Sequence, residues 1–287
     1  MLALTPVVSE LHNTMKQLLI LVALCLSCAS QQALVVEEVG APTVPTQEFQ
    51  VVSQSLTDCG VKLTGSLEAP AALTMEKATF ELVVDGTVLK SGEQPLGIAV
   101  AAGQSGTFTL EQTFTYVKDT EELKAMDARG GSLLVAIRGN IVTTIAGKSV
   151  LVPFAKSKEV RTPRLPHVKY QEYEAGRFSE SEVQAVFHVG VVNPNGFELS
   201  LTNLGYQVTI AGKKVKEDVI GAGERVAPGS TAVFDITATV NEESHGKDVK
   251  KLIKGLVLPF VLTGTLKTPL YEEALDAKGD IKLNLSK

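Results

Sequence analysis

Residues 183–210 read VQAVFHVGVVNPNGFELSLTNLGYQVTI. Two runs of alternating apolar and polar residues, 183–189 and 205–210, flank the stretch Asn193-Pro194-Asn195. Pro194 has no backbone N–H, and the two asparagines can bond their own main chain, so this stretch cannot continue a strand. It therefore predicts a shaped connection between two strands of a sheet.

The same alternation recurs along most of the chain. Examples lie at residues 61–67, 79–84, 107–110 and 133–137. A period of two with β-branched and aromatic residues indicates antiparallel strands with one buried face. Hydrophobic residues make up 44% and charged residues 21% of a chain of 287 residues, a balance typical of globular proteins with room for two domains. The sequence predicts an all-β protein.

An internal repeat divides this β protein into halves. At an offset of 126 residues, Phe80 aligns with Tyr206 and Phe108 with Phe234, and Gly139 aligns with Gly264 after a one-residue adjustment. The halves meet at Arg161-Thr162-Pro163-Arg164-Leu165-Pro166, where the two prolines disfavour both helix and central strand. We expect two tandem antiparallel β-sandwiches, a first copy over residues 49–163 and a second over residues 164–287.

Each copy contains one helical segment before its penultimate strand. Residues 120–128 place Leu123 and Met126 behind Glu121 and Glu122, and residues 247–255 place apolar side chains at helical spacing opposite four lysines. The lysine face has two interpretations, which are attraction to anionic lipid or acidic partners and a solvated helix face at one end of a sandwich. We favour the second, because only four lysines are involved and two glutamates lie nearby.

The N-terminus predicts export and lipid attachment. Lys16 precedes the apolar run 18–26, which is too short to span a bilayer and has the length of a signal-peptide core. The following Leu26-Ser27-Cys28-Ala29 resembles a bacterial lipobox, in which Cys28 carries the lipid. We expect a signal peptide over residues 1–27, with translation starting at Met15, and a lipidated N-terminus and flexible tether over residues 28–48. An ordinary secretory signal with incidental cysteines is the alternative.

No motif for catalysis, metal or cofactor binding emerges from the rest of the chain. Cys59 would remain as a single thiol without a nearby histidine, which excludes an internal disulfide and disfavours a nucleophile. His12, His167, His188 and His245 are scattered, with no spacing typical of metal ligands. A net charge of −5 and the lack of a basic, aromatic-rich stretch argue against binding to nucleic acid. We predict no enzyme activity, cofactor or metal.

The second copy resembles the type 2 late embryogenesis abundant family, also called the water stress and hypersensitive response domain. The resemblance is carried by Asn193-Pro194-Asn195 after an apolar strand and by Val226-Ala227-Pro228-Gly229-Ser230-Thr231 downstream. It implies an immunoglobulin-like or fibronectin-like β-sandwich with one short helix and a non-enzymatic role in desiccation or osmotic stress. It extends more weakly to the first copy, where Leu67-Glu68-Ala69-Pro70-Ala71-Ala72 lacks both asparagines. We therefore interpret Asn193, Pro194 and Asn195 as residues that shape a loop.

Together these features predict a protein of the cell envelope, anchored in a membrane through the lipid on Cys28. Ala29 gives no acidic retention signal, which favours the outer membrane, facing the periplasm, if the host has two membranes. The predicted role is protection during water loss. The alternative is a scaffold or binding module in which tandem sandwiches contact an envelope protein or a lipid.

Overall fold

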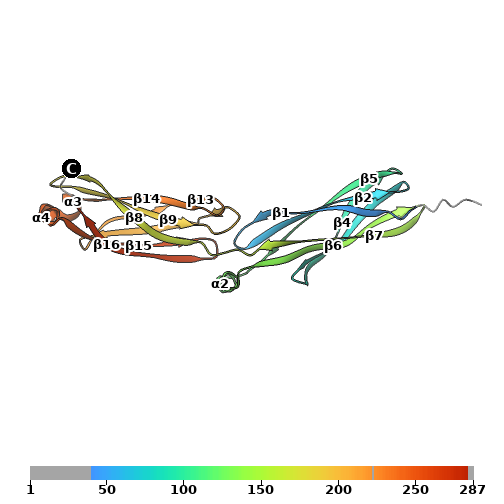
Figure 1. The fold of residues 1–287 in the computed structure, drawn as a ribbon, viewed down its shortest axis with the longest axis horizontal. Coiled ribbons are helices and arrows are strands. Elements are labelled where there is room, and N and C mark those ends of the chain that lie inside the picture. Colours follow the sequence, from blue (N-terminus) through green and yellow to red (C-terminus); the bar gives the residue numbers. More distant parts are fainter. Residues whose placement is uncertain (1–39, 222, 284–287) are drawn as a thin grey trace, which may run out of the picture. The chain divides into compact units, whose positions relative to one another are not determined.

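The computed structural model describes residues 40–221 and 223–283 of the chain (Figure 1). Nearly all of this part consists of antiparallel strands, so the prediction of an all-β, sandwich-like fold is confirmed. The predicted signal peptide (1–27), Cys28 and the first part of the predicted tether lie outside the described residues. From Thr43 onward the chain forms one compact unit.

The first half forms two facing sheets. Its elements are β1 (Thr43–Gln54), β2 (Asp58–Ala69), β3 (Leu73–Val84), β4 (Thr87–Val100), β5 (Gln104–Thr115), α2 (Thr120–Arg129), β6 (Ser132–Ile145) and β7 (Lys148–Arg161). One sheet has the order β1-β2-β5 and the other the order β4-β3-β6-β7. Alternate residues of β2 and β5 are buried between the sheets, where the rings of Phe108 and Phe154 lie 5.3 Å apart.

The second half repeats this arrangement. Its elements are β8 (His167–Phe178), β9 (Val183–Val192), β10 (Leu199–Ser200), β11 (Asn203–Ile210), β12 (Lys213–Ile220), β13 (Arg225–Val226), β14 (Thr231–Val240), α3 (Glu242–His245), the 3₁₀ helix η1 (Gly246–Asp248), α4 (Val249–Lys254), β15 (Val257–Lys267) and β16 (Glu272–Lys282). The sheets have the orders β14-β9-β8 and β12-β11-β15-β16, which match those of the first half. The short pair β10-β13 corresponds to the end of the longer pair β3-β4.

The two halves also share the register of their central strands. Phe80 of β3 lies opposite Gly139 of β6, and Tyr206 of β11 lies opposite Gly264 of β15. A Cβ atom added to either glycine would overlap a backbone carbonyl oxygen of the neighbouring strand. The glycines of the sequence repeat therefore mark places where two strands approach closely.

The helical segments agree only in part with the prediction. In the first half, α2 covers the predicted residues and is capped by Asp119, whose Oδ1 accepts a hydrogen bond of 2.9 Å from the Glu122 amide. In the second half, α4 lies within the predicted range of residues 247–255 and follows η1. The short helix α3 was not predicted; Asn241 begins it with a capping box, and Gly246, with φ of +66°, ends it after one turn. None of the helices within the described residues has both the length and the hydrophobicity that a membrane span needs.

The first strand begins earlier than expected. The tether is predicted to extend to residue 48, but β1 starts at Thr43 and buries Phe49 in the core. Pro45 is accommodated because β1 is an edge strand and its register shifts between Thr43 and Thr46. The C-terminal end of the predicted tether is therefore corrected, since residues 43–48 belong to the sandwich.

Candidate functional site

The loop Asn193-Pro194-Asn195 leaves β9 and leads to β10, and its polar side chains are buried. Asn193 is 0% exposed and Asn195 is 4% exposed. A buried amide is costly unless its donors and acceptors are bonded, so the partners of these two side chains decide what the loop does.

The Asn193 side chain ties the loop together and to a second turn. Its Nδ2 donates to the carbonyl oxygens of Phe197 at 2.8 Å, Val226 at 3.0 Å and Ala227 at 3.2 Å. Its Oδ1 accepts from both the backbone amide and the Nδ2 of Asn195, each at 3.0 Å. The turn that it reaches belongs to the segment Val226–Thr231. Folding therefore brings together the two stretches of sequence that carry the family resemblance.

Backbone hydrogen bonds reinforce the same contact. The Asn193 amide donates to the Ser230 carbonyl at 2.8 Å, and the Gly229 amide donates to the Asn195 carbonyl at 2.8 Å. Gly229 has φ of +62°, a conformation that favours glycine and that turns its amide toward the loop. Every polar group of the Asn193 side chain is thereby used within the loop and the turn.

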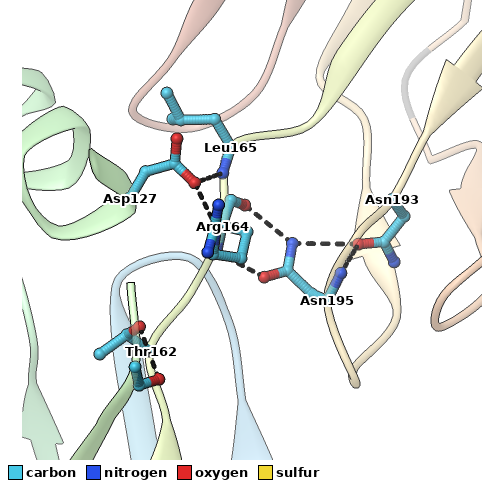
Figure 2. Close-up of polar contacts among 7 residues, drawn as sticks. Asp127, Thr162, Arg164, Leu165, Asn193 and Asn195 are labelled. Carbon is cyan, nitrogen blue, oxygen red and sulfur yellow. Dashed lines mark hydrogen bonds and ion pairs between the residues drawn. The ribbon is translucent and has the colours of Figure 1, made fainter. Parts of the chain in front are cut away.

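Asn195 reaches outward to the connector between the sandwiches, which is the segment of residues 161–166. Its Oδ1 accepts from the Arg164 backbone amide at 2.6 Å, and its Nδ2 donates to the Arg164 carbonyl at 2.9 Å. The side-chain amide thus bonds Arg164 as a neighbouring strand would. Figure 2 shows Arg164 between this amide and the carboxylate of Asp127 on α2.

Asp127 holds the connector from the other side. Its Oδ1 accepts from the Arg164 Nε at 2.7 Å and from the Leu165 amide at 3.2 Å. The sequence contains no signal for this residue, because it lies 38 positions from Leu165 in an ordinary surface position of a helix. In the sequence, Arg164 is marked only by its place between Pro163 and Pro166. Asp127 and Arg164 are the residues of this site that sequence reasoning missed.

A recess of about 500 Å³ opens beside this network. Its lining includes Pro194, Asn195 and Asp127 together with the connector residues Arg161, Thr162, Arg164 and Leu165. A side-chain amide does not titrate near neutral pH, and the Asn195 amide is already bonded to Arg164 and Asn193. The arrangement can hold a chain in place, and its asparagines supply no acid, base or nucleophile.

The described histidines lie at separate places. His188 on β9 contacts Asp235 on β14, with Nδ1 2.7 Å from Oδ1, and its Nε2 is 3.8 Å from Glu174 on β8. His245 is buried, with its Nε2 3.0 Å from the Ile210 carbonyl oxygen. His167 pairs with Glu273, and His12 lies outside the described residues. No cluster of three His, Cys, Asp or Glu residues suited to a metal occurs in the described ranges.

Cys59 is a core residue of the first sandwich. Its side chain is 0% exposed, and burial raises the pKa of its thiol above the ordinary value. The neighbouring Tyr116 also has a raised pKa, chiefly because of burial, so it offers no base. A thiol in this setting is less reactive than a free one.

One family model matches the chain. Residues 188–271 match the family described as Late embryogenesis abundant protein, and no curated protein matches the chain in sequence. The matched range begins in β9 and includes the asparagine loop, the Pro228-Gly229 turn and the strands up to β15. The family is not one of enzymes.

Several solved structures are distantly similar. A protein from Archaeoglobus fulgidus has 14% identity and a TM-score of 0.29, over 40% of this chain and 98% of that one. A protein from Arabidopsis thaliana has 16% identity and a TM-score of 0.32, over 41% of this chain and 81% of that one. A β-glucuronidase from Bacteroides uniformis has 10% identity and a TM-score of 0.29, over 82% of this chain and 32% of that one. TM-scores this low carry no argument about function. The family match, in contrast, shows that this chain carries a type 2 late embryogenesis abundant-like domain in its second sandwich.

Proposed function

We propose that this protein is a non-enzymatic, membrane-anchored envelope protein that protects other components during desiccation or osmotic stress. The observation that carries the proposal is the family match over residues 188–271. The asparagine loop agrees with a non-enzymatic role, because the side chains of Asn193 and Asn195 form hydrogen bonds within the loop, with the neighbouring turn and with the connector. A folded protein of this kind acts through its surface and its location rather than through a reaction.

The drying test asks whether the folded part protects an enzyme. A drying-sensitive reporter enzyme is dried and rehydrated with residues 43–287 of this protein, or with an equal mass of an unrelated β-sandwich. We expect more reporter activity to survive with this protein. Equal survival with the two proteins would contradict the protective role.

The proposed anchor is the lipid on Cys28, which would hold the sandwiches at a membrane surface. Stable attachment requires more than one acyl chain, and a diacylated cysteine with an acylated amine supplies them. Metabolic labelling with a fatty acid should mark the wild-type protein and place it in the membrane fraction, the outer membrane in a host with two membranes. Cys28→Ala should remove both the label and the membrane association. A wild-type protein without label would reduce the proposal to secretion.

A second candidate function is an envelope scaffold that contacts a protein or a lipid. It is favoured by the connector, whose backbone is bonded on both sides and could hold two binding surfaces at a set spacing. Crosslinking in cells, followed by purification, should then recover a specific partner that is lost when either sandwich is deleted. Recovery of abundant bystanders alone would count against the scaffold.

A further inference from the structure

The connector between the sandwiches leaves no backbone donor unused. The Thr162 amide and hydroxyl both donate to the Gly131 carbonyl, at 3.1 and 3.0 Å. The amides of Arg164 and Leu165 donate to Asn195 and Asp127, and the remaining residues between Thr162 and Pro166 are prolines without an N–H. A flexible linker would expose these groups to water, so this connector is part of the folded structure.

Arg164 is held by both sandwiches at once. Its backbone is bonded by Asn195 of the second sandwich, and its guanidinium is bonded by Asp127 of the first. The ion pair is partly open to water, with side chains 50% and 21% exposed, so its own energy is modest. The ion pair helps to position the connector, because Asp127 also accepts a hydrogen bond from the Leu165 amide and so holds two consecutive residues.

The helix that carries Asp127 packs on the second sandwich. Leu123 and Met126 of α2 join a core cluster made mostly of second-half residues, together with Leu56 and Val117 from the first half. Leu123 is 0% exposed, and the Thr120 hydroxyl donates to the Leu270 carbonyl at 2.5 Å. The sequence assigns α2 to the first copy, whereas its apolar face stabilises the contact with the second.

We propose that Asp127, Arg164 and Asn195 form an interlock that fixes the second sandwich on the first, so that the two move as one body in solution. This goes beyond the proposed protective function, which does not require any particular relation between the copies. Connectors bonded only to water would let the copies reorient freely. The interlock replaces that freedom with directional hydrogen bonds backed by the packing of α2.

Pulsed electron resonance between two spin labels tests the interlock. Labels are placed at Lys90→Cys and Thr237→Cys, two exposed positions on β4 and β14, in the full-length chain with Cys25 and Cys28 replaced by serine. Buried Cys59 stays unlabelled. The labelled protein with the interlock unchanged should give a single narrow distance distribution. A broad distribution at this stage would overturn the proposal.

Asp127→Ala then removes the acceptor for the Arg164 guanidinium and the Leu165 amide, and should broaden the distribution by about twofold or more. Asp276→Ala, an exposed aspartate of β16, is the matched control and should leave the width unchanged. Asn195→Ala should also broaden the distribution, provided that circular dichroism shows an intact fold. An Asp127→Ala protein as narrow as the control would overturn the interlock.

Discussion

The turn after β2 and the turn after β9 occupy the same place in the two sandwiches, yet they are held differently. After β2 the chain turns through Pro70-Ala71-Ala72, and the contact with the following turn consists of backbone bonds, including Gly103 amide to Ala69 carbonyl at 2.7 Å. After β9 the corresponding Gly229 bond is joined by the side-chain bonds of Asn193 and Asn195. In the short turn, backbone groups bond one another directly. The longer, buried turn needs side-chain amides that take the place of backbone donors and acceptors.

The location of each turn explains why. The turn after β9 lies against the connector, whose Arg164 needs partners for its amide and its carbonyl. No strand is available there, because β8 begins only at His167. The Asn195 amide supplies one donor and one acceptor in the spacing of a strand. Buried polar groups of this kind stabilise only when every partner is present.

The largest effect should come from removing the centre of this network. Asn193→Ala deletes the donor to the Phe197 and Val226 carbonyls and the acceptor of Asn195, which leaves several buried groups unbonded. We expect a loss of about 4 kcal/mol in the free energy of unfolding, measured with urea. Asn140→Ala, at a half-buried position of β6, should cost well under about 1 kcal/mol. A similar cost for both substitutions would refute the contrast between the two turns.

The next effect tests what the sandwiches share. Gly139→Ala and Gly264→Ala both introduce a Cβ beside a backbone carbonyl oxygen, of Thr79 and Gly205 respectively. Overpacking against backbone should cost about 3 kcal/mol at Gly139 and about 2 kcal/mol at Gly264, where the approach is less close. Gly86→Ala, with open space around its Cβ but a φ of +82°, separates strain from overpacking. The midpoint of thermal unfolding measures both effects. If it is unchanged in either Gly139→Ala or Gly264→Ala, the two strand contacts are not equivalent.

A reciprocal substitution asks whether an asparagine helps in the first turn. Ala69 is buried, with 2% of its surface exposed, and it lies at the end of β2 where Asn193 follows β9. Ala69→Asn would bury an amide where the existing turn already satisfies its backbone, so we expect a loss of about 2 kcal/mol. The matched change Ala69→Val keeps the site apolar and should cost less. A stabilised Ala69→Asn protein would mean that the two turns are interchangeable.

The smallest effect concerns a difference between the cores. The first sandwich has Cys59 on β2 opposite Phe114, and the second has Val183 on β9 opposite Val240. Because burial raises the pKa of the Cys59 thiol, the unfolded chain loses this proton first as pH rises above roughly 8.5, and folding stability falls there. Cys59→Val should reduce that alkaline loss by about 1 kcal/mol or less between pH 8 and pH 10. The unfolding free energy of both proteins against pH measures it, and parallel curves would contradict the expectation.

Much of the fold followed from local patterns. Alternation predicted the strands because it depends on residues close together in the chain. The repeat placed Phe80 and Tyr206 at equivalent positions because the two halves carry similar residue types in the same order. The start of β1 at Thr43 was missed because Pro45 is typical of a tether and only the edge position of the strand makes it acceptable. The short helix α3 was missed because its four residues are too few to show a helical pattern, and the capping box at Asn241 depends on the folded backbone.

The properties of the site also fall into those that the sequence shows and those that the folded structure sets. The sequence by itself determined that Asn193-Pro194-Asn195 leaves a strand and that it carries no catalytic chemistry, since those properties belong to the residue types. Tertiary structure alone decided that Asn195 bonds Arg164 and that Asp127 completes the contact from α2. The reason is that a hydrogen bond requires two groups within about 3 Å in a defined direction, and only the folded chain sets that geometry for residues far apart in sequence.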